Sequence, residues 1–360
     1  MKERLRLLDT TLRDGSYVIN FQFTARDTAV IAAQLEAAGF ELIEIGHGVG
    51  LGASERNYGR AAETDESYMA AAAEAVKRAM WGMFSIPGIS TLEDIDMAAD
   101  YGMKFLRVGT NVADVPDSQP FIERAKKHGM FVCANYMKSY VAAPKEFARN
   151  AQLSQQYGAD AVYIVDSAGG MLTRDMESYF HAVQDVCDVS IGFHGHDNLG
   201  LGVANAVRAA ELGAAIVDTS LQGMGRSAGN TPTEQFIAVM ERSGVPMGFD
   251  PLRVMDIGEK YIKPLIRYDG LNSLDIVSGY AQFHSSYMGV IREYSSKFGV
   301  DPRKLIIALC ERDRVNAPRA LVEELARTLS AEPDDTFSAR FHLDRYYGAE
   351  QNPDPPRSAS

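Results

Sequence analysis

Cysteine is scarce in this chain of 360 residues, and negative charge outweighs positive charge. The three cysteines, Cys133, Cys187 and Cys310, lie far apart without C-x-x-C spacing, which argues against a disulfide framework and a zinc knuckle. The formal net charge of -12 disfavours non-specific binding to nucleic acid or to an anionic membrane, because both require clustered positive charge. Small molecules and protein partners are the ligands that this balance favours.

Long apolar runs are also missing. No stretch of about 18 apolar residues occurs, and the first residues carry charges where a secretory signal would carry an apolar core. We therefore expect a cytoplasmic protein that neither crosses a membrane nor binds nucleic acid.

Short apolar runs alternate with amphipathic helical patterns through the first two thirds of the chain. Eight runs are typical of strands: residues 5–9, 41–46, 80–86, 104–109, 130–135, 161–166, 190–195 and 215–220. Eight strand-helix alternations within about 240 residues predict an α/β fold of the (β/α)8 TIM-barrel type. A doubly wound sheet is the alternative, but no G-x-G-x-x-G follows the first run.

The pattern changes after residue 243, where helical periodicity replaces the alternation. We expect a TIM-barrel catalytic domain over 1–243, a C-terminal helical region over 244–335, and a flexible tail over 336–360, which is proline-rich and polar.

Two histidines stand two positions apart in the glycine-rich stretch GFHGHDNLGLG, residues 192–202. In an extended segment, residues i and i+2 point to the same side, so His194 and His196 are placed to meet one ion at a strand end. A hydrogen-bonded histidine pair is the alternative. Metal ligation also requires a carboxylate from elsewhere in the chain.

Polar side chains follow nearly every expected strand, and barrel enzymes carry their chemistry at these strand ends. Each such group has an alternative role as the cap of the following helix. Taken together with Asp14 opposite the H-x-H pair, they favour a divalent-metal site with positions left open for substrate. The groups are Asp14, Glu44, His47, Ser85, Arg107, Asn135, Asp166, Ser167, His194, His196, Asp218 and the segment 223–230.

Five segments of the chain together resemble one known family. They are DTTLRDGS from residue 9, NYG at 57–59, DSAGGM at 166–171, HGHDNLGLGVANAV from residue 194 and GMGRSAGN at 223–230. In this order they are similar to the metal-dependent 4-hydroxy-2-oxovalerate aldolases of the DRE-TIM metallolyase superfamily. The likeness runs from about residue 8 to about residue 325 and is far more specific than any single motif.

The resemblance implies a metal site and its ligands. In that family an aspartate and the H-x-H pair hold the metal, which corresponds here to Asp14, His194 and His196. Asn230 matches a position that adds a ligand in some relatives, and a loop cap is its alternative role. Manganese is the metal implied, with Mg²⁺, Co²⁺ and Zn²⁺ as alternatives.

The resemblance also implies an activity: cleavage or formation of a 4-hydroxy-2-oxo acid, to or from pyruvate (or a close 2-oxo acid) and an aldehyde. Arg13 would stabilise the enolate and bind substrate, and Glu44 would orient Arg13. Ser167 matches a contact to the substrate carboxylate. Such chemistry is consistent with the residues, because one carboxylate and two neutral imidazoles leave a divalent ion with net positive charge.

Two positions depart from the family pattern in an exchanged way. Where these aldolases carry a histidine three residues after the aspartate ligand, this chain has Tyr17, and where they carry a tyrosine, it has His284. A general base works best with a pKa near the operating pH, which fits histidine at about 6.5. We expect His284 to take the proton of the C4 hydroxyl, directly or through Tyr17; independent change of the two positions is the alternative.

A further departure concerns Phe84 and Ile86 in the segment FSIP, where relatives have leucines. These residues would shape the aldehyde end of the pocket, so a changed aldehyde is expected. Family members of aromatic degradation bind an aldehyde dehydrogenase through their C-terminal region, which diverges here, so this partner is not carried over. A homo-oligomer is compatible with the sequence.

Two other functions remain open at this point. One is a Claisen-type acyl-CoA condensing enzyme of the same superfamily, although RDGSY differs from the RDGEQ-like start of those synthases. The other is a non-catalytic metal-binding homologue that acts as a subunit.

Overall fold

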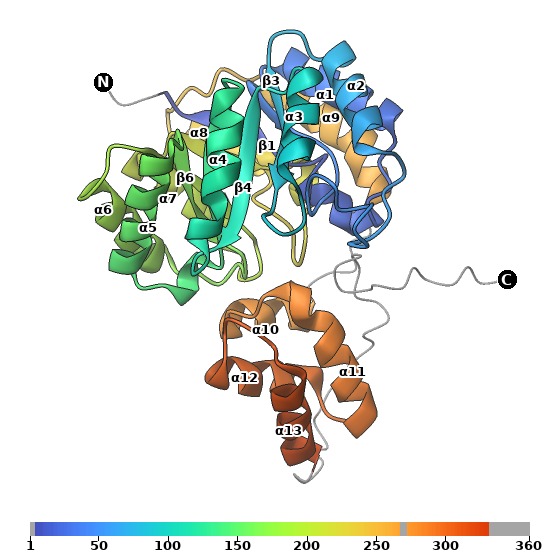
Figure 1. Ribbon diagram of the computed structural model, residues 1–360, viewed down its shortest axis with the longest axis vertical. Helices are drawn as coiled ribbons and strands as arrows, with labels where there is room; N and C mark the ends of the chain where they lie inside the picture. The colour runs from blue at the N-terminus through green and yellow to red at the C-terminus, as the bar shows by residue number, and fades with distance from the viewer. Residues whose placement is uncertain (1–3, 267–271, 331–360) are drawn as a thin grey trace, which may run out of the picture.

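Eight parallel strands close into a barrel in the computed structural model, which describes residues 4–266 and 272–330 (Figure 1). Each strand pairs with its neighbours in chain order, and β1 closes the barrel against β8. The strands are β1 (Arg6–Asp9), β2 (Leu42–Glu44), β3 (Met80–Ser85), β4 (Phe105–Asn111), β5 (Phe131–Met137), β6 (Ala161–Asp166), β7 (Ser190–Gly195) and β8 (Ile216–Thr219). The predicted TIM barrel is confirmed.

The strands are almost entirely buried, which explains why they read as continuous apolar runs in the sequence. Parallel pairing brings residues far apart in the chain into register: Leu8 of β1 pairs with Leu42 on one side and Asp218 on the other. All carboxyl ends therefore open on the same rim of the barrel.

Eight helices follow the strands and surround the barrel: α1 (Ala25–Ala38), α2 (Asp65–Ala75), α3 (Leu92–Asp100), α4 (Gln119–Lys127), α5 (Pro144–Tyr157), α6 (Thr173–Gln184), α7 (Gly202–Leu212) and α8 (Thr233–Arg242). Thr24 and Thr91 begin α1 and α3 with capping boxes. Gly39 and Gly158 end α1 and α5 at positive φ, the conformation that glycine adopts most easily. Among the described residues, no helix is both long and apolar enough for a membrane span.

Beyond α8 the chain is helical, as predicted, but its parts pack differently. Helix α9 (Pro251–Ile257) lies against α1 and α8, and Val254 and Ile257 join the main hydrophobic core. Helices α10 (Ser273–Ala281), α11 (Met288–Phe298), α12 (Pro302–Arg312) and α13 (Arg319–Ser330) instead share a second core with Met288, Ile291 and Leu305 at its centre. The tail predicted over 336–360 and residues 331–335 lie outside the described residues.

Shorter helical segments connect these elements. The 3-10 segments are Asp14–Ile19, Val115–Ser118, Ser139–Val141, Leu221–Gly223, Lys263–Leu265 and Ser285–Tyr287, and Gly258–Ile262 is a π-helix.

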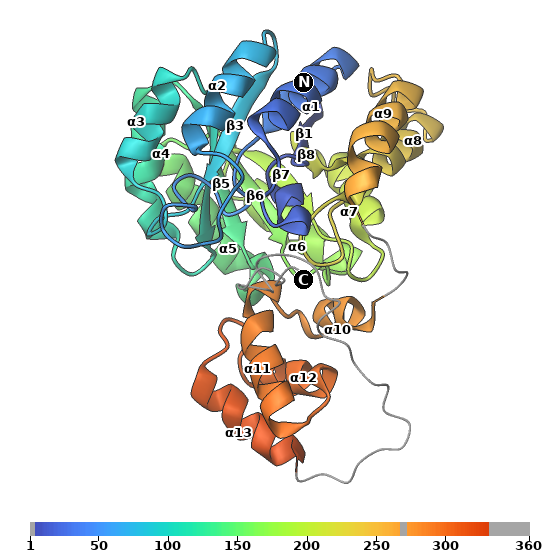
Figure 2. The same cartoon turned by 90° about the vertical axis from the view of Figure 1, so that its right-hand side faces the viewer.

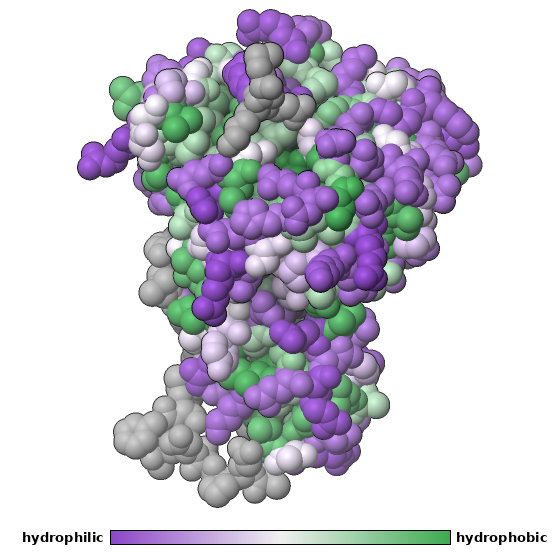
Figure 3. All heavy atoms as spheres, turned by 90° about the vertical axis from the view of Figure 1, so that its left-hand side faces the viewer, coloured by the Kyte–Doolittle hydropathy of each residue, from purple (hydrophilic) through white to green (hydrophobic). Residues whose placement is uncertain are grey.

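The helices α11, α12 and α13 form a group at one end of the barrel in both ribbon views (Figures 1 and 2). Figure 3 shows a face on which hydrophilic side chains predominate, with small hydrophobic areas between them. Side chains from the carboxyl-end rim of the barrel contact this group: Lys138 follows β5 and donates to Tyr287, and Arg226 follows β8 and contacts His284. The C-terminal helices therefore cover the rim where barrel enzymes hold their active sites.

Candidate metal and active site

Asp14, His194 and His196 converge at the carboxyl-end rim of the barrel. Their ligand atoms all lie within 4.8 Å of one another, and all three side chains are buried. Asp14 begins the 3-10 segment after β1, and His194 belongs to β7, with His196 just beyond it. The carboxylate and the H-x-H pair that the sequence singled out are thus brought together, 180 residues apart in the chain.

Both histidines are oriented by acceptors on their Nδ1 side. Nδ1 of His194 lies 2.8 Å from Oδ2 of Asp218. Nδ1 of His196 lies 3.1 Å from the carbonyl oxygen of Arg226 and 3.3 Å from that of Gly229. A carbonyl oxygen only accepts, so Nδ1 of His196 carries the hydrogen and Nε2 keeps its lone pair. Hydrogen bonds of this kind fix the tautomer and orientation of metal-binding histidines.

The protonation of these groups suits a cation site. Burial lowers the pKa of His196 well below 6.5, and the charge of Arg226 adds to this effect, so the imidazole is neutral. Burial alone would raise the pKa of Asp14, but the neighbouring positive charges, that of Arg13 first, hold it well below its ordinary value. The site therefore offers an ionised carboxylate and a neutral imidazole.

Asn230 adds a fourth donor beside Asp14. Its Nδ2 donates to Oδ2 of Asp14 at 2.9 Å, whereas its Oδ1 is buried and has no hydrogen-bond partner among the described residues. A Cβ on Gly225 would lie 2.5 Å from Cγ of Asn230, so only glycine fits there. An unpaired buried oxygen beside a carboxylate and two imidazoles fits a divalent cation, because this nitrogen and oxygen donor set suits manganese, magnesium, cobalt or zinc.

Arg13 and Glu44 are also in contact, as the sequence analysis expected. Nη1 of Arg13 donates to Oδ1 of Asp14 at 2.6 Å, and its Nε donates to Oε2 of Glu44 at 2.7 Å. The ring of Phe84 lies 4.7 Å from the guanidinium carbon of Arg13. Arg13 is therefore held on two sides by carboxylates and on a third by an aromatic face.

Arg107 extends this arrangement into a continuous network. It is fully buried in β4, and it donates to Glu44 at 2.9 Å, to Asp218 at 2.6 Å and to Asn135 at 2.8 Å. The charges of Asp218 and Glu44 outweigh burial and raise its pKa further. Because Glu44 holds Arg13 and Asp218 holds His194, Arg107 couples the two halves of the site.

His284 reaches the rim from the loop between α10 and α11. It is 7% exposed, its Nε2 lies 3.0 Å from Nη1 of Arg226, and its Nδ1 lies 2.6 Å from Oγ of Ser286. Burial, followed by the charges of Arg226 and Lys138, lowers the pKa of His284 well below 6.5. This differs from the ordinary histidine value assumed from the sequence, and it keeps the imidazole neutral at physiological pH.

Tyr17 lies in the 3-10 segment Asp14–Ile19 and is 7% exposed. Its ring packs edge-on against Phe21 at 5.0 Å, and Phe21 stacks on His47 at 3.8 Å. Burial lowers the pKa of His47 to about 4, so this ring is a neutral packing partner. The functional pairing of Tyr17 with His284 stays a prediction.

The remaining predicted residues lie at or just beyond the carboxyl ends of β3 and β6. Oγ of Ser167, just after β6, accepts the backbone N–H of Lys138 at 2.9 Å. Phe84 is buried in β3, and Ile86 is half-buried in the turn that follows, where its carbonyl oxygen accepts from Ser90.

Arg107 and Asp218 were expected only as members of the polar strand-end groups, without individual roles, and Arg226 only as part of the segment 223–230. A charged residue inside an apolar strand, as Arg107 is, was the available signal, because buried charges persist only when paired.

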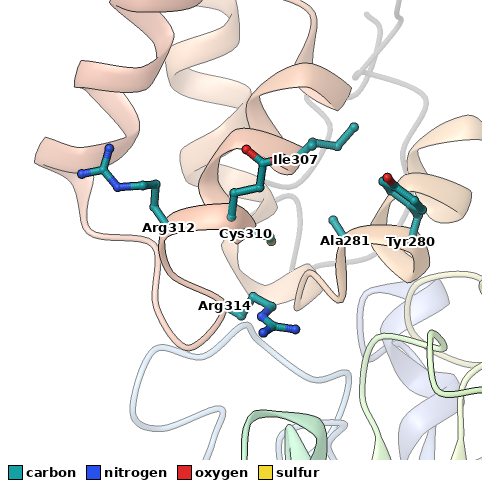
Figure 4. Close-up of a pocket in the computed structure, with 7 residues that line it drawn as sticks. Tyr280, Ala281, Ile307, Cys310, Arg312 and Arg314 are labelled. Carbon is teal, nitrogen blue, oxygen red and sulfur yellow. The ribbon is translucent and has the colours of Figure 1, made fainter. Parts of the chain in front are cut away.

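A separate depression lies in the C-terminal helices (Figure 4). The depression is lined by Tyr280, Ala281, Ile307, Cys310, Glu311, Arg312 and Arg314. Burial raises the pKa of Cys310 to about 12, so its sulfur is a protonated thiol. The cluster of Asp14, His194 and His196 lies elsewhere.

The sequence is similar to known proteins over most of its length. A model of the HMGL-like family matches residues 4–260. The 4-hydroxy-2-oxovalerate aldolase of Carboxydothermus hydrogenoformans is 38% identical over 92% of this chain and 98% of its own length. That of Moorella thermoacetica is 38% identical over 91% of this chain and 97% of its own length.

A solved structure shares the fold at lower identity. The carboxyl transferase domain of Rhizobium etli pyruvate carboxylase superposes with a TM-score of 0.74 at 17% identity, over 91% of this chain and 60% of that chain. At this identity the likeness concerns the fold alone.

Proposed function

The chain belongs to the HMGL-like family, and from this premise we propose that it is a divalent-metal-dependent aldolase that cleaves or forms a 4-hydroxy-2-oxo acid. The products of cleavage are pyruvate, or a close 2-oxo acid, and an aldehyde. The observation that carries the proposal is the buried convergence of Asp14, His194 and His196 within 4.8 Å, with Arg13 bonded to Asp14.

Asp14, His194 and His196 would hold the ion, with Asn230 as a fourth donor. We favour manganese, and magnesium, cobalt and zinc suit the same donors. When bound, such an ion supplies positive charge at the 2-oxo acid. Arg13 is the fixed protein cation next to this position, and a positive group held in place before reaction stabilises negative charge that develops on the 2-oxo oxygen.

Cleavage breaks the bond between C3 and C4, and the C4 hydroxyl becomes the aldehyde. His284, which is neutral and buried, would take the hydroxyl proton, directly or through Tyr17, while the bonding electrons pass to the 2-oxo acid as its enolate. A proton then returns to C3 to give the 2-oxo acid. Ser167 would contact the substrate carboxylate, and Phe84 and Ile86 would border the aldehyde.

The three cysteines are free thiols, which suits the reducing cytoplasm that we propose as its location. A homo-oligomer is compatible with this assignment, and we carry over no dehydrogenase partner.

The test is release of pyruvate from a panel of 4-hydroxy-2-oxo acids, with and without added Mn²⁺, using the full chain. We expect metal-dependent release from at least one member. Release of free CoA from an acyl-CoA and a 2-oxo acid would instead identify a Claisen-type enzyme. Absence of turnover with every oxo acid, despite bound metal, would identify a non-catalytic homologue.

A further inference from the structure

Arg226 places one buried guanidinium between two imidazoles of the site. The residue lies in the loop after β8 and is 8% exposed. Its Nη2 lies 3.3 Å from Nε2 of His196, and its Nη1 lies 3.0 Å from Nε2 of His284 and 3.0 Å from Oγ of Ser285. The segment GMGRSAGN contributed to the family assignment, but its arginine has no role in the chemistry described above.

The contact with His196 uses the atom that a metal requires. Nδ1 of His196 faces two carbonyl oxygens and must donate, so the lone pair is on Nε2. A guanidinium only donates, and its hydrogen bond to Nε2 occupies that lone pair. Ligation by His196 and this hydrogen bond therefore exclude each other, and Arg226 has to turn to another acceptor when the metal binds.

The contact with His284 has the same consequence. Nδ1 of His284 faces Ser286, with the hydroxyl oxygen at 2.6 Å and the backbone nitrogen at 3.3 Å. Nε2 faces the guanidinium of Arg226, which only donates, so Nε2 carries a lone pair and is the atom available to a substrate. Arg226 covers this atom as well. A proton acceptor at the C4 hydroxyl needs the lone pair of Nε2, so the guanidinium must leave both imidazoles before cleavage.

The partner that draws a buried guanidinium away from two imidazoles has to be a better acceptor than they are. A carboxylate meets this condition, because it is charged and accepts two parallel N–H bonds from one guanidinium. Nη1 lies within one hydrogen bond of the imidazole assigned to the C4 hydroxyl, so the acceptor belongs on the C4 side of the substrate. Arg13, which is bonded to Asp14 and Glu44, lies beside the 2-oxo acid.

We propose that Arg226 binds a carboxylate on the aldehyde half of the substrate, so that the preferred substrate is a 4-hydroxy-2-oxo diacid. The inference rests on the proposed aldolase function and adds its substrate class. Lys138, which follows β5, contacts the same C-terminal segment from another part of the rim: its Nζ donates to the hydroxyl of Tyr287 at 2.6 Å and to the carbonyl of Val315 at 2.9 Å. Two cations thus flank the segment that carries His284.

The first measurement is binding, and it does not depend on turnover. Calorimetry of the Mn²⁺-loaded full chain compares 2-oxoglutarate with 2-oxopentanoate, which carry a carboxylate and a methyl group at the same carbon and cannot be cleaved. We expect 2-oxoglutarate to bind at least about tenfold more tightly, which corresponds to about 1.4 kcal/mol. Arg226→Gln should abolish this ratio, and Arg226→Lys should keep part of it. Arg174→Gln, at an exposed arginine on α6, is the matched control and should keep the full ratio.

The second measurement is the ratio of kcat/KM for pyruvate release from 4-hydroxy-2-oxoglutarate and 4-hydroxy-2-oxopentanoate, which should follow the binding ratio. Mn²⁺ affinity of Arg226→Gln should equal or exceed that of the unchanged chain, because the competing hydrogen bond is gone. Equal binding of both 2-oxo acids by the unchanged chain would overturn the inference, as would an undiminished ratio in a folded Arg226→Gln protein. If no 4-hydroxy-2-oxo acid of the panel is cleaved, the proposed function fails, and the calorimetric ratio still decides the role of Arg226.

Discussion

At the scale of single residues, the ligand set yields the most direct prediction. His194→Ala and Asp14→Asn each remove one of three convergent donors, so we expect Mn²⁺ affinity to fall by about 100-fold or more and pyruvate release to be lost. Metal content after dialysis and the rate of pyruvate release measure both effects. His181→Ala, at an exposed histidine on α6, is the matched control. Full metal occupancy with full activity in either variant would remove the ligand assignment.

Arg13 is predicted to act through the shape of its guanidinium. Its Nε and Nη1 reach Glu44 and Asp14 at 2.7 and 2.6 Å, and a single ammonium cannot reproduce this fork. Arg13→Lys should therefore lower kcat roughly 100-fold while Mn²⁺ affinity changes less than about tenfold. Arg174→Lys makes the same exchange on the surface and should leave both values alone. An unaltered kcat in Arg13→Lys would show that Arg13 is structural.

The role of His284 predicts a particular pH profile. A base must be neutral to accept a proton, so activity falls as the pH drops through its pKa. Burial, followed by the charges of Arg226 and Lys138, lowers the pKa of His284 well below 6.5, so the acid limb of kcat/KM, which reports the enzyme before substrate binds, should lie below pH 6.5. His284→Ala should remove this limb and most of the rate. Metal occupancy measured at each pH distinguishes this acid limb from a loss of metal that protonation of the ligands would cause. An unchanged pH profile in His284→Ala would exclude His284 as the base.

The exchanged pair provides a double-mutant cycle. Tyr17→His combined with His284→Tyr restores the arrangement of the family and should retain measurable pyruvate release, whereas each single change should be worse. Tyr17→Phe should be milder than His284→Ala, because it removes only a hydroxyl. Losses that simply add in the double variant would show that the two positions are not partners.

The sequence was sufficient to identify the three converging residues, Asp14 through the family resemblance, and insufficient for the side chains that hold them in place; the reason is physical. His194 and His196 are two residues apart, so strand geometry alone places both side chains on one side. Arg107 meets Glu44 across 63 residues and Asp218 across 111, and only closure of the barrel brings these groups together. The same holds for Arg226 and His284, which lie 58 residues apart, the first in a loop after β8 and the second in a loop between helices of the second core.

At the scale of elements, all eight strands were predictable because each is a buried apolar run between turn residues. The carboxyl ends of β4 and β5 were not predictable in this way, since both strands continue two residues beyond the runs expected at 104–109 and 130–135. The polar Asn111 still pairs in register with Met137, so neighbouring backbone hydrogen bonds outweigh side-chain polarity there. The packing of α9 was not predictable either. Its sequence continues the helical pattern of the C-terminal region, but its Val254 packs in the barrel core.

The end of β1 carries a prediction about stability. Asp9 is fully buried and bonded to the N–H and hydroxyl of Thr11, and burial raises its pKa from 3.8 to about 7. Between these two values the folded state holds a proton that the unfolded state has released, so the free energy of unfolding falls as the pH rises from about 4 to about 7.

Asp9→Asn removes the ionisation and keeps an acceptor for Thr11. The decrease in unfolding free energy between pH 5 and pH 8 should therefore shrink by on the order of 2 kcal/mol, measured by urea denaturation. Asp185→Asn, at the exposed end of α6, should leave the pH dependence unchanged. Equal pH dependence in Asp9→Asn and the unchanged chain would mean that Asp9 does not titrate in this range.

At the scale of the whole molecule, the site is completed by two separately cored units. The barrel supplies the proposed ligands, and His284 lies in the loop between α10 and α11, two helices of the second core. Contacts between the rim and this part of the chain include those of Arg226 with His284 and Ser285 and of Lys138 with Tyr287. Asn198 also donates to the carbonyl of Asp275 in α10 at 3.0 Å. Under the proposed assignment, metal binding and proton transfer depend on different units, so they should respond separately to a change at the junction.

Tyr287 tests this separation. Its hydroxyl accepts from Nζ of Lys138 at 2.6 Å and donates to the carbonyl oxygen of Val315 at 2.9 Å, so Tyr287→Phe removes two bonds worth about 1 kcal/mol each. We expect kcat to fall several-fold to about tenfold while Mn²⁺ affinity stays within about twofold. Amide hydrogen exchange should accelerate in residues 284–315 and remain slow in β1–β8. Tyr280→Phe is the matched control, because that side chain is 71% exposed on α10 and should change none of these values. A parallel loss of Mn²⁺ affinity in Tyr287→Phe would show that the two units do not act separately.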